Sequence, residues 1–141
     1  RYPIAKDGTS YTTPAGVTIV AFRGFMEPKN LEEITLSEEI DTLNYSSLYL
    51  LENITVTVQN SECYFAPNAL YYPSNVTIKA ITGSTAEAFA NNAGEGITFE
   101  SMGTSLGKLD SPTNVYWDGY TVRWDAVPNA TIIASETALN N

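Results

Sequence analysis

The stretch that decides the fold is Leu31-Glu32-Glu33-Ile34-Thr35-Leu36, which returns as Leu51-Glu52-Asn53-Ile54-Thr55-Val56 twenty positions later. A shorter copy, Asn75-Val76-Thr77-Ile78, begins 22 positions after Asn53. A second match, at 23 positions, aligns residues 11–19 with residues 34–42 and pairs Phe22 with Tyr45. Similarity at a fixed spacing of this size indicates a stacked array of repeats.

The L-x-x-I-x-L spacing of these copies is typical of a half-buried strand, because alternate residues of a strand point to opposite faces. The residues predicted to point inward are Leu31, Ile34 and Leu36, and those predicted to point outward are Glu33 and Thr35. One such strand cannot bury its apolar face alone, so the copies must stack over a shared core. We therefore expect the strands around Ile34, Ile54 and Val76 to be parallel neighbours, with Ile54 in the middle.

Three further segments follow one another in an order that is typical of a known repeat: Tyr11-Thr12-Thr13-Pro14-Ala15-Gly16-Val17-Thr18, then Ala21-Phe22, then residues 31–36. In this respect the chain resembles the leucine-rich repeat family, and within it the bacterial surface-antigen (BspA-like) subclass. The resemblance covers about residues 1–100, with residues 57–74 a poor copy. It implies a solenoid of parallel strands, secreted or displayed on a bacterial surface, that contacts proteins or polysaccharides.

Residues 84–94 are predicted to form a helix. Ser84 and Glu87 have the spacing of a capping box, the alanines between them and Gly94 favour helix, and Gly94 suits the C-terminal end. One face of this helix carries Ala86, Phe89, Ala90 and Ala93. Terminal units of the BspA-like subclass often end in a similar helix, so we expect this one to cap the last repeat.

Asp118-Gly119, between two strand-like segments, predicts a hairpin with a two-residue turn. Such a turn sets Trp117 opposite Tyr120 and Val115 opposite Val122, and places these four with Trp124 on one face. Residues 109–113 and 122–128 resemble the first two strands of a fibronectin type III domain, and residues 130–135 suit a third. Because such a domain needs about seven strands, we expect a domain cut short; the alternative is a ribbon that caps the solenoid.

The predicted fold class is thus α/β and strand-rich, in three parts. A leucine-rich-repeat solenoid with a capping helix spans residues 1–102, a linker spans residues 103–109, and a truncated fibronectin type III-like β segment spans residues 110–141. No apolar run approaches the ~20 residues of a membrane span. Since Arg1-Tyr2-Pro3 begins inside a repeat motif, we interpret the chain as part of a longer protein.

The net charge of −9 argues against nucleic acid or an anionic membrane surface as a partner, because both would repel the chain. Cys63 is the only cysteine and lies among Tyr64, Phe65 and Ala66, so we expect a buried, inert thiol. N-x-S/T sequons begin at Asn44, Asn53, Asn75 and Asn129. They are glycan acceptors in a eukaryotic secreted protein, but for a bacterial chain we expect no glycosylation.

The sequence predicts no catalytic, cofactor-binding or metal-binding residues. It contains no histidine, which excludes Ser-His and Cys-His pairs, and it contains neither a phosphate-binding loop nor a calcium-binding loop. Glycoside hydrolysis needs two carboxylates that face one another across a sugar. Glu32 and Glu33 are adjacent on a strand and point to opposite faces, so they cannot act as this pair.

We therefore predict a non-enzymatic binding, adhesion or spacer module; the alternative is an ancillary module of a larger carbohydrate-active enzyme. The candidate binding residues are the outward polar positions Glu33, Thr35, Asn53, Thr55, Thr57 and Thr77. The candidate self-association residues are Val115, Trp117, Tyr120, Val122 and Trp124. Rings at Tyr71, Tyr72, Tyr116 and Trp117 leave sugar stacking open, although packing inside the protein is the more ordinary role for each.

Overall fold

The computed structural model describes residues 8–104 and 113–125. The chain divides into two compact units, Arg1–Ser105 and Leu106–Asn141, which are described separately below. The Tyr2-Pro3 motif, most of the expected linker, and the expected third strand at residues 130–135 lie outside the described residues.

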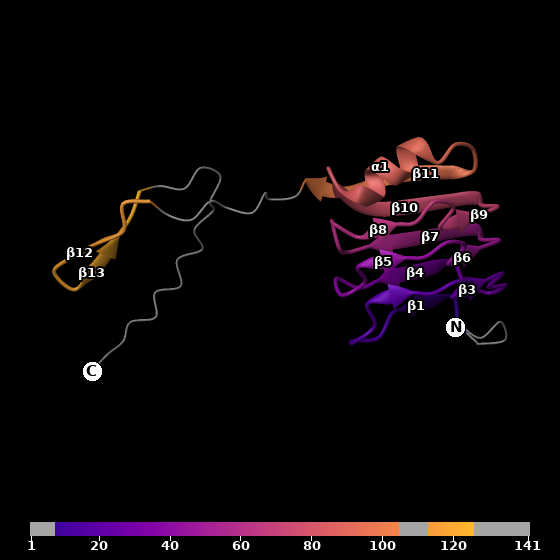
Figure 1. Ribbon diagram of the computed structural model, residues 1–141, viewed down its shortest axis with the longest axis horizontal. Coiled ribbons are helices and arrows are strands. Elements are labelled where there is room, and N and C mark those ends of the chain that lie inside the picture. Colours follow the sequence, from indigo (N-terminus) through magenta and orange to yellow (C-terminus); the bar gives the residue numbers. More distant parts are fainter. Residues whose placement is uncertain (1–7, 105–112, 126–141) are drawn as a thin grey trace. The chain divides into compact units, whose positions relative to one another are not determined.

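The first unit is a parallel β-solenoid of about four coils, built around three parallel sheets (Figure 1). The largest sheet, sheet A, contains β1 (Ser10–Thr12), β4 (Glu33–Leu36), β7 (Glu52–Val58), β10 (Ser74–Thr82) and β11 (Ile97–Thr104). Sheet B contains β2 (Ile19–Val20), β5 (Thr42–Leu43) and β8 (Tyr64–Phe65). Sheet C contains β3 (Phe25–Met26), β6 (Leu48–Tyr49) and β9 (Leu70–Tyr71).

The strands of sheet A follow the order of the chain, and all are parallel. The predicted order, with the Ile54 strand between those of Ile34 and Val76, is confirmed. The register pairs Ile34 with Val56 and Val76 with Ile54, a spacing of 22 residues. The twenty-residue match in the sequence is therefore two residues short of the spatial repeat. The 23-residue match agrees with the pairing of Tyr11 with Ile34.

The core runs along the axis of the solenoid and is filled by the inward residues of all three sheets. Leu31, Ile34 and Leu36 are buried as predicted, whereas Glu33 is exposed and Thr35 is half-buried. One column of inward residues across sheet A consists of Tyr11, Ile34, Val56, Ile78 and Phe99. Residues 57–74, a poor copy in sequence, contain the end of β7 and all of β8 and β9, so they follow the same path as the two coils before them.

Two corners of the solenoid are built from residues in the left-handed region. Arg23, Ser46 and Asn68 have φ of 52°, 48° and 55° and occupy equivalent places between sheets B and C. The corner between sheets C and A likewise contains one left-handed residue in each of three coils: Glu27, Leu50 and Tyr72, with φ of 47°, 51° and 54°. Few non-glycine residues adopt this conformation, and each is held here by the coils beside it. The chain therefore turns at the same two places in each of the first three coils.

Helix α1 (Thr85–Asn92) is the only helix in the described residues, so strands define this fold and the α/β expectation is too broad. The Ser84 hydroxyl caps it by accepting a hydrogen bond of 3.3 Å from the Glu87 N–H. The Glu87 carboxylate accepts one of 2.6 Å from the Gly83 N–H. The helix packs on β8 and β10, with the Phe89 and Phe65 rings 4.6 Å apart. Because β11 follows the helix and extends sheet A, the helix does not end the array.

The second unit contains an antiparallel hairpin of β12 (Tyr116–Asp118) and β13 (Thr121–Arg123). The turn differs from the prediction, because Asp118 pairs with Thr121 and Trp117 pairs with Val122. Gly119 and Tyr120 are thus the central residues, and Gly119 has φ of 64°, as a type II′ turn requires at its first central position. Tyr120 lies in the turn and not opposite Trp117.

Candidate functional site

The outward face of sheet A carries two polar columns, which we call the ladder face. The first column is Ser10, Glu33, Thr55, Thr77 and Thr98, and the second is Thr12, Thr35, Thr57, Lys79 and Glu100. Neighbouring side chains are about 4.8 Å apart along each column, because that distance separates paired strands. Five of the six predicted binding residues lie on this face. The sixth, Asn53, lies at its edge, where its side-chain oxygen accepts a hydrogen bond of 2.8 Å from the Asn75 amide.

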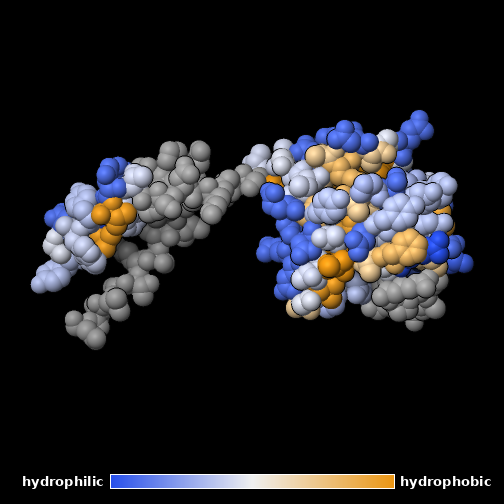
Figure 2. All heavy atoms as spheres, viewed as in Figure 1, coloured by the Kyte–Doolittle hydropathy of each residue, from blue (hydrophilic) through white to orange (hydrophobic). Residues whose placement is uncertain are grey.

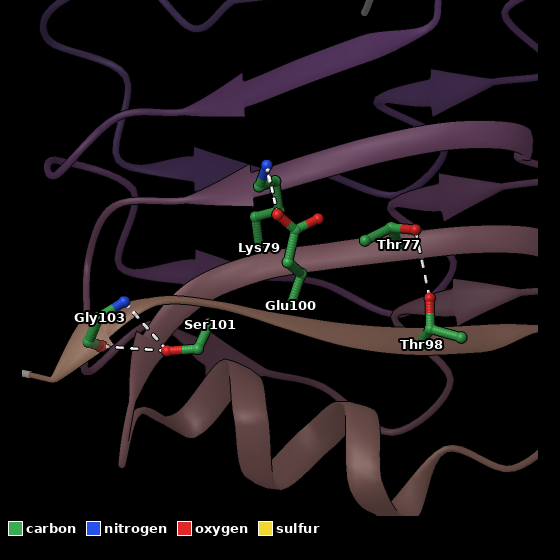
Figure 3. Close-up of polar contacts among 6 residues, drawn as sticks. All are labelled: Thr77, Lys79, Thr98, Glu100, Ser101 and Gly103. Atoms are coloured by element: carbon green, nitrogen blue, oxygen red, sulfur yellow. Dashed lines mark hydrogen bonds and ion pairs between the residues drawn. The ribbon is translucent and has the colours of Figure 1, made fainter.

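The ladder face is cross-linked between its last two strands (Figure 3). The hydroxyls of Thr77 and Thr98 point toward each other and share a hydrogen bond of 3.2 Å. Lys79 and Glu100 form an ion pair of 2.8 Å. Both pairs are solvent-accessible, so each contributes little to stability. The columns contain no aromatic side chain, and strong interfaces usually depend on aromatic or arginine anchors.

Such anchors gather elsewhere on the solenoid, in a cluster that we call the aromatic patch. It consists of Phe22, Arg23, Tyr45, Tyr49, Tyr71 and Tyr72. Phe22 is 57 % exposed, Tyr45 49 % and Tyr72 64 %, while Tyr49 and Tyr71 are half-buried. On the face seen in Figure 2, hydrophobic residues of the solenoid form small separate areas on a largely hydrophilic surface.

The rings of the aromatic patch contact one another from coil to coil. Phe22 stacks on Tyr45 with centroids 6.2 Å apart, and Tyr49 stacks on Tyr71 with centroids 5.8 Å apart. Tyr45 lies 6.0 Å from Tyr71 and so joins the two stacks, and Tyr72 meets Tyr71 edge-on at 4.4 Å. Because equivalent residues of successive coils are in register, repeated aromatic positions produce continuous rows.

Polar groups complete the aromatic patch. The Arg23 guanidinium lies over the Phe22 ring at 5.0 Å and over the Tyr49 ring at 4.9 Å, which are cation–π distances. A hydrogen bond with Tyr72 raises the pKa of Tyr71, and the nearby Tyr72 and Tyr45 hydroxyls raise it further. The Tyr71 ring lies 6.0 Å from the Tyr45 ring and 4.4 Å from the Tyr72 ring, so the three side chains meet at the surface.

The sequence pointed to only part of this patch. Tyr71 and Tyr72 are candidate sugar-stacking residues in the sequence, and the structure places them side by side with Tyr45 and Tyr49. Phe22, Arg23, Tyr45 and Tyr49 are not predicted as site residues. A signal for them existed, because the 23-residue match pairs Phe22 with Tyr45, and paired positions of a solenoid become neighbours in space.

Two cavities lie outside the aromatic patch. One, of about 820 Å³, is at the corner between sheets C and A and is lined by mostly polar residues that include Glu27, Lys29, Glu32 and Glu52. The other, of about 580 Å³, lies beside α1 and is lined by residues that include Phe65, Leu70, Phe89 and Ile97. No aromatic-patch residue lines either one.

The hairpin presents a second aromatic surface. Trp117 pairs with Val122, and continuing this register places Val115 opposite Trp124 on the same face. Trp117 is 72 % exposed, and hydrophobic residues of the hairpin are visible at its surface in Figure 2. Tyr116 lies on the other face of the hairpin, where Arg123 is its partner on the neighbouring strand. Arg123 also forms an ion pair of 2.7 Å with Asp118. Four of the five candidate self-association residues therefore share a face, and Tyr120 is in the turn.

Cys63 is fully buried, as expected. Its burial, and to a lesser extent the charge of Asp41, raises its pKa to about 11, so the thiol is protonated at neutral pH.

Within residues 8–104 and 113–125, no three His, Cys, Asp or Glu residues are placed to hold a metal ion. Glu33 is on the ladder face, whereas Glu32 lines the corner cavity. In the same part of the chain, no helix has the length and apolarity needed to cross a membrane.

Comparison of the chain with protein-family models, with curated proteins and with solved structures finds no match.

Proposed function

We propose that this chain is a non-enzymatic binding module that contacts a protein or a polysaccharide through the surface of its solenoid. The observation that carries the proposal is the aromatic patch, where five rings and one guanidinium from three coils lie together at the surface. Exposed clusters of this kind are typical of interaction sites. Tyrosine and arginine are also enriched among the residues that dominate binding energy.

The ladder face has a supporting role in this proposal. Its threonines are half-buried or exposed, its Lys79–Glu100 pair is solvent-accessible, and it lacks a large anchor, so any contact made there alone is weak. A ligand held by the aromatic patch and extended along the solenoid would gain affinity from several coils at once, because linked contacts raise the effective concentration. We therefore expect micromolar or weaker binding for the isolated chain.

The proposed biological setting is based on the sequence resemblance alone. Repeats similar to the BspA-like leucine-rich repeats suggest a secreted or cell-surface bacterial protein, in which many coils act together. A resemblance of the second unit to fibronectin type III supports a second candidate function, a spacer within a larger carbohydrate-active enzyme. The observation that favours it is the antiparallel hairpin in a compact unit separate from the solenoid.

The test is a binding screen with the purified chain immobilised on a biosensor. The analytes are a panel of neutral and acidic polysaccharides and a panel of purified extracellular-matrix proteins. We expect saturable binding to at least one analyte, and loss of that binding in a Tyr45→Ala/Tyr71→Ala variant. Tyr64→Ala is the matched control, because Tyr64 is 58 % exposed on sheet B outside the patch. Absence of binding to every analyte at concentrations up to about 1 mM would contradict the proposed function.

A further inference from the structure

The fourth coil of the solenoid lacks a strand that each of the first three coils contains. Those coils contribute one strand each to sheets A, B and C, whereas the fourth runs from β10 through α1 directly into β11 (Figure 1). Val76 pairs with Ile97, so this coil is about as long as the others, and its residues form a helix in place of two short strands. Within residues 8–104, β9 is therefore the last strand of sheet C, and one of its edges has no neighbouring strand.

The open edge of β9 presents backbone N–H groups in a fixed register. In the second coil, the N–H groups of Ser46, Leu48 and Leu50 donate to carbonyl oxygens of the third coil at 2.9, 3.0 and 2.9 Å. The equivalent N–H groups of the third coil are those of Asn68, Leu70 and Tyr72. No acceptor for these three groups lies in the part of the chain that the structure describes. Unpaired backbone groups on an edge strand are a template for pairing with another strand.

The cavity of about 580 Å³ beside α1 lies at this open edge, and we call it the α1 groove. Its apolar lining comes from four elements, with Phe65 from β8, Leu70 from β9, Phe89 from α1 and Ile97 from β11. Asn68 and Leu70, which carry two of the free N–H groups, both line it. The groove therefore combines an edge for backbone pairing with apolar surface for side chains, as sites of strand addition do.

An extended peptide is the occupant that matches this edge. The free N–H groups belong to every second residue, so they are about 6.6 Å apart along the strand. Carbonyl groups of alternate residues in an extended peptide have the same spacing, because strands rise by the same length per residue. The coils below already show this arrangement, since β9 lies parallel to β6 and accepts its N–H groups in the equivalent place.

Charge selects the kind of peptide. Glu95 is the only charged residue that lines the α1 groove, and the last turn of α1 contains no basic residue to balance the negative end of the helix dipole. Glu95 lies at the end toward which β9 runs, because a Cβ at the adjacent Gly96 would be 2.6 Å from the Pro73 carbonyl oxygen. In a chain of net charge −9, this end of the groove favours a cationic side chain.

We propose that the α1 groove binds an extended segment of a partner protein, which adds to β9 as a parallel strand and completes sheet C in the fourth coil. The segment places apolar side chains in the groove and a lysine or arginine at its C-terminal end, next to Glu95. This inference goes beyond the proposed function, because no aromatic-patch residue lines the groove.

The probe is a fluorescein-labelled peptide with the sequence of residues 67–71 followed by one lysine, because these residues include the sheet-C strand of the third coil. Fluorescence anisotropy follows its binding to the whole chain. We expect saturable binding with a Kd below about 1 mM. A matched peptide that ends in glutamate should bind about threefold or more weakly, because it places like charges side by side.

Variants of α1 and of Glu95 test the position of the peptide. Ala88 is exposed and lines the groove, so the ring of Ala88→Trp should fill it and raise the Kd about tenfold or more. Asn91→Trp is the matched control, because Asn91 is exposed on the same helix and lines neither cavity, and its Kd should stay within about twofold of wild type. Glu95→Lys should reverse the preference between the two peptides, and it keeps the test decisive if far-UV circular dichroism shows Ala88→Trp to be unfolded.

Four results would overturn the inference. The first three are no saturable binding of the lysine peptide up to about 1 mM, equal binding by Ala88→Trp and wild type, and an unchanged peptide preference in Glu95→Lys. The fourth is a wild-type dimer that Ala88→Trp, but not Asn91→Trp, converts to monomer in sedimentation velocity. That result would assign the groove to a second copy of this chain.

Discussion

Exchanging valine and threonine at two adjacent positions of β7 tests the facing of the solenoid strands. Val56 is fully buried between Ile34 and Ile78, and Thr57 is on the ladder face between Thr35 and Lys79. Valine and threonine have nearly the same shape, so Val56→Thr leaves no cavity and adds one buried hydroxyl. The backbone groups around it are already paired in the sheet. We therefore expect Val56→Thr to lower the free energy of unfolding by about 1–3 kcal/mol.

Thr57→Val makes the reverse change on the outer face, where it should alter the free energy of unfolding by less than about 0.5 kcal/mol. Urea titration followed by far-UV circular dichroism and by tyrosine fluorescence measures both variants. Agreement of the two probes is needed, because repeat arrays do not always unfold in one step. Equal effects of the two substitutions, or a neutral Val56→Thr, would refute the assignment of inward and outward positions in sheet A.

Three further predictions concern the core, the thiol and the hairpin. Ile54→Ala should cost ~2–5 kcal/mol in a urea titration and Thr55→Ala under ~0.5 kcal/mol; similar losses would contradict the strand facing. Burial raises the pKa of Cys63 from 9.0 to about 11, so its contribution to stability is present below pH 9 and is lost as the pH rises through 11. The wild type should therefore lose stability relative to Cys63→Ala in this window, and a constant difference would show an unshifted thiol. If the exposed face of the hairpin drives self-association, Trp117→Ser with Trp124→Ser should shift a dimer to monomer in sedimentation velocity; a wild-type chain that stays monomeric at high concentration would exclude it.

The main features of the solenoid could be predicted from its sequence. The strand order and the inward positions at Leu31, Ile34 and Leu36 are confirmed. They could be predicted because buried positions of these strands carry apolar residues and outward positions carry polar ones. The twenty-residue spacing of the sequence match is two residues shorter than the 22-residue spacing between paired strands. The facing survived this error, because a slip of one residue exchanges the two faces of a strand and a slip of two restores them. The same holds in the hairpin, where the pairing of Trp117 shifted by two from Tyr120 to Val122.

Other features could not be read from the sequence. The strands of sheets B and C have only two residues each, too few to show a period. Strand β11 has a single stretch of alternation, and most of its residues are exposed. The aromatic patch depends on which coils become neighbours and on where each coil turns. Its members are spread from Phe22 to Tyr72, so they form a cluster only after the register and the corners are known.

The register of sheet A also bears on how this chain would respond to tension. Ile34 pairs with Val56 and Val76 with Ile54, so each coil is fastened only to the coils beside it, about 22 residues away along the chain. A pull on one end of such a stack loads the outermost coil first, and its release transfers the load to the next. Each released coil adds a length of about 70–80 Å of extended chain, at 3.3–3.6 Å per residue. A solenoid of this kind lengthens in steps of one coil at a time.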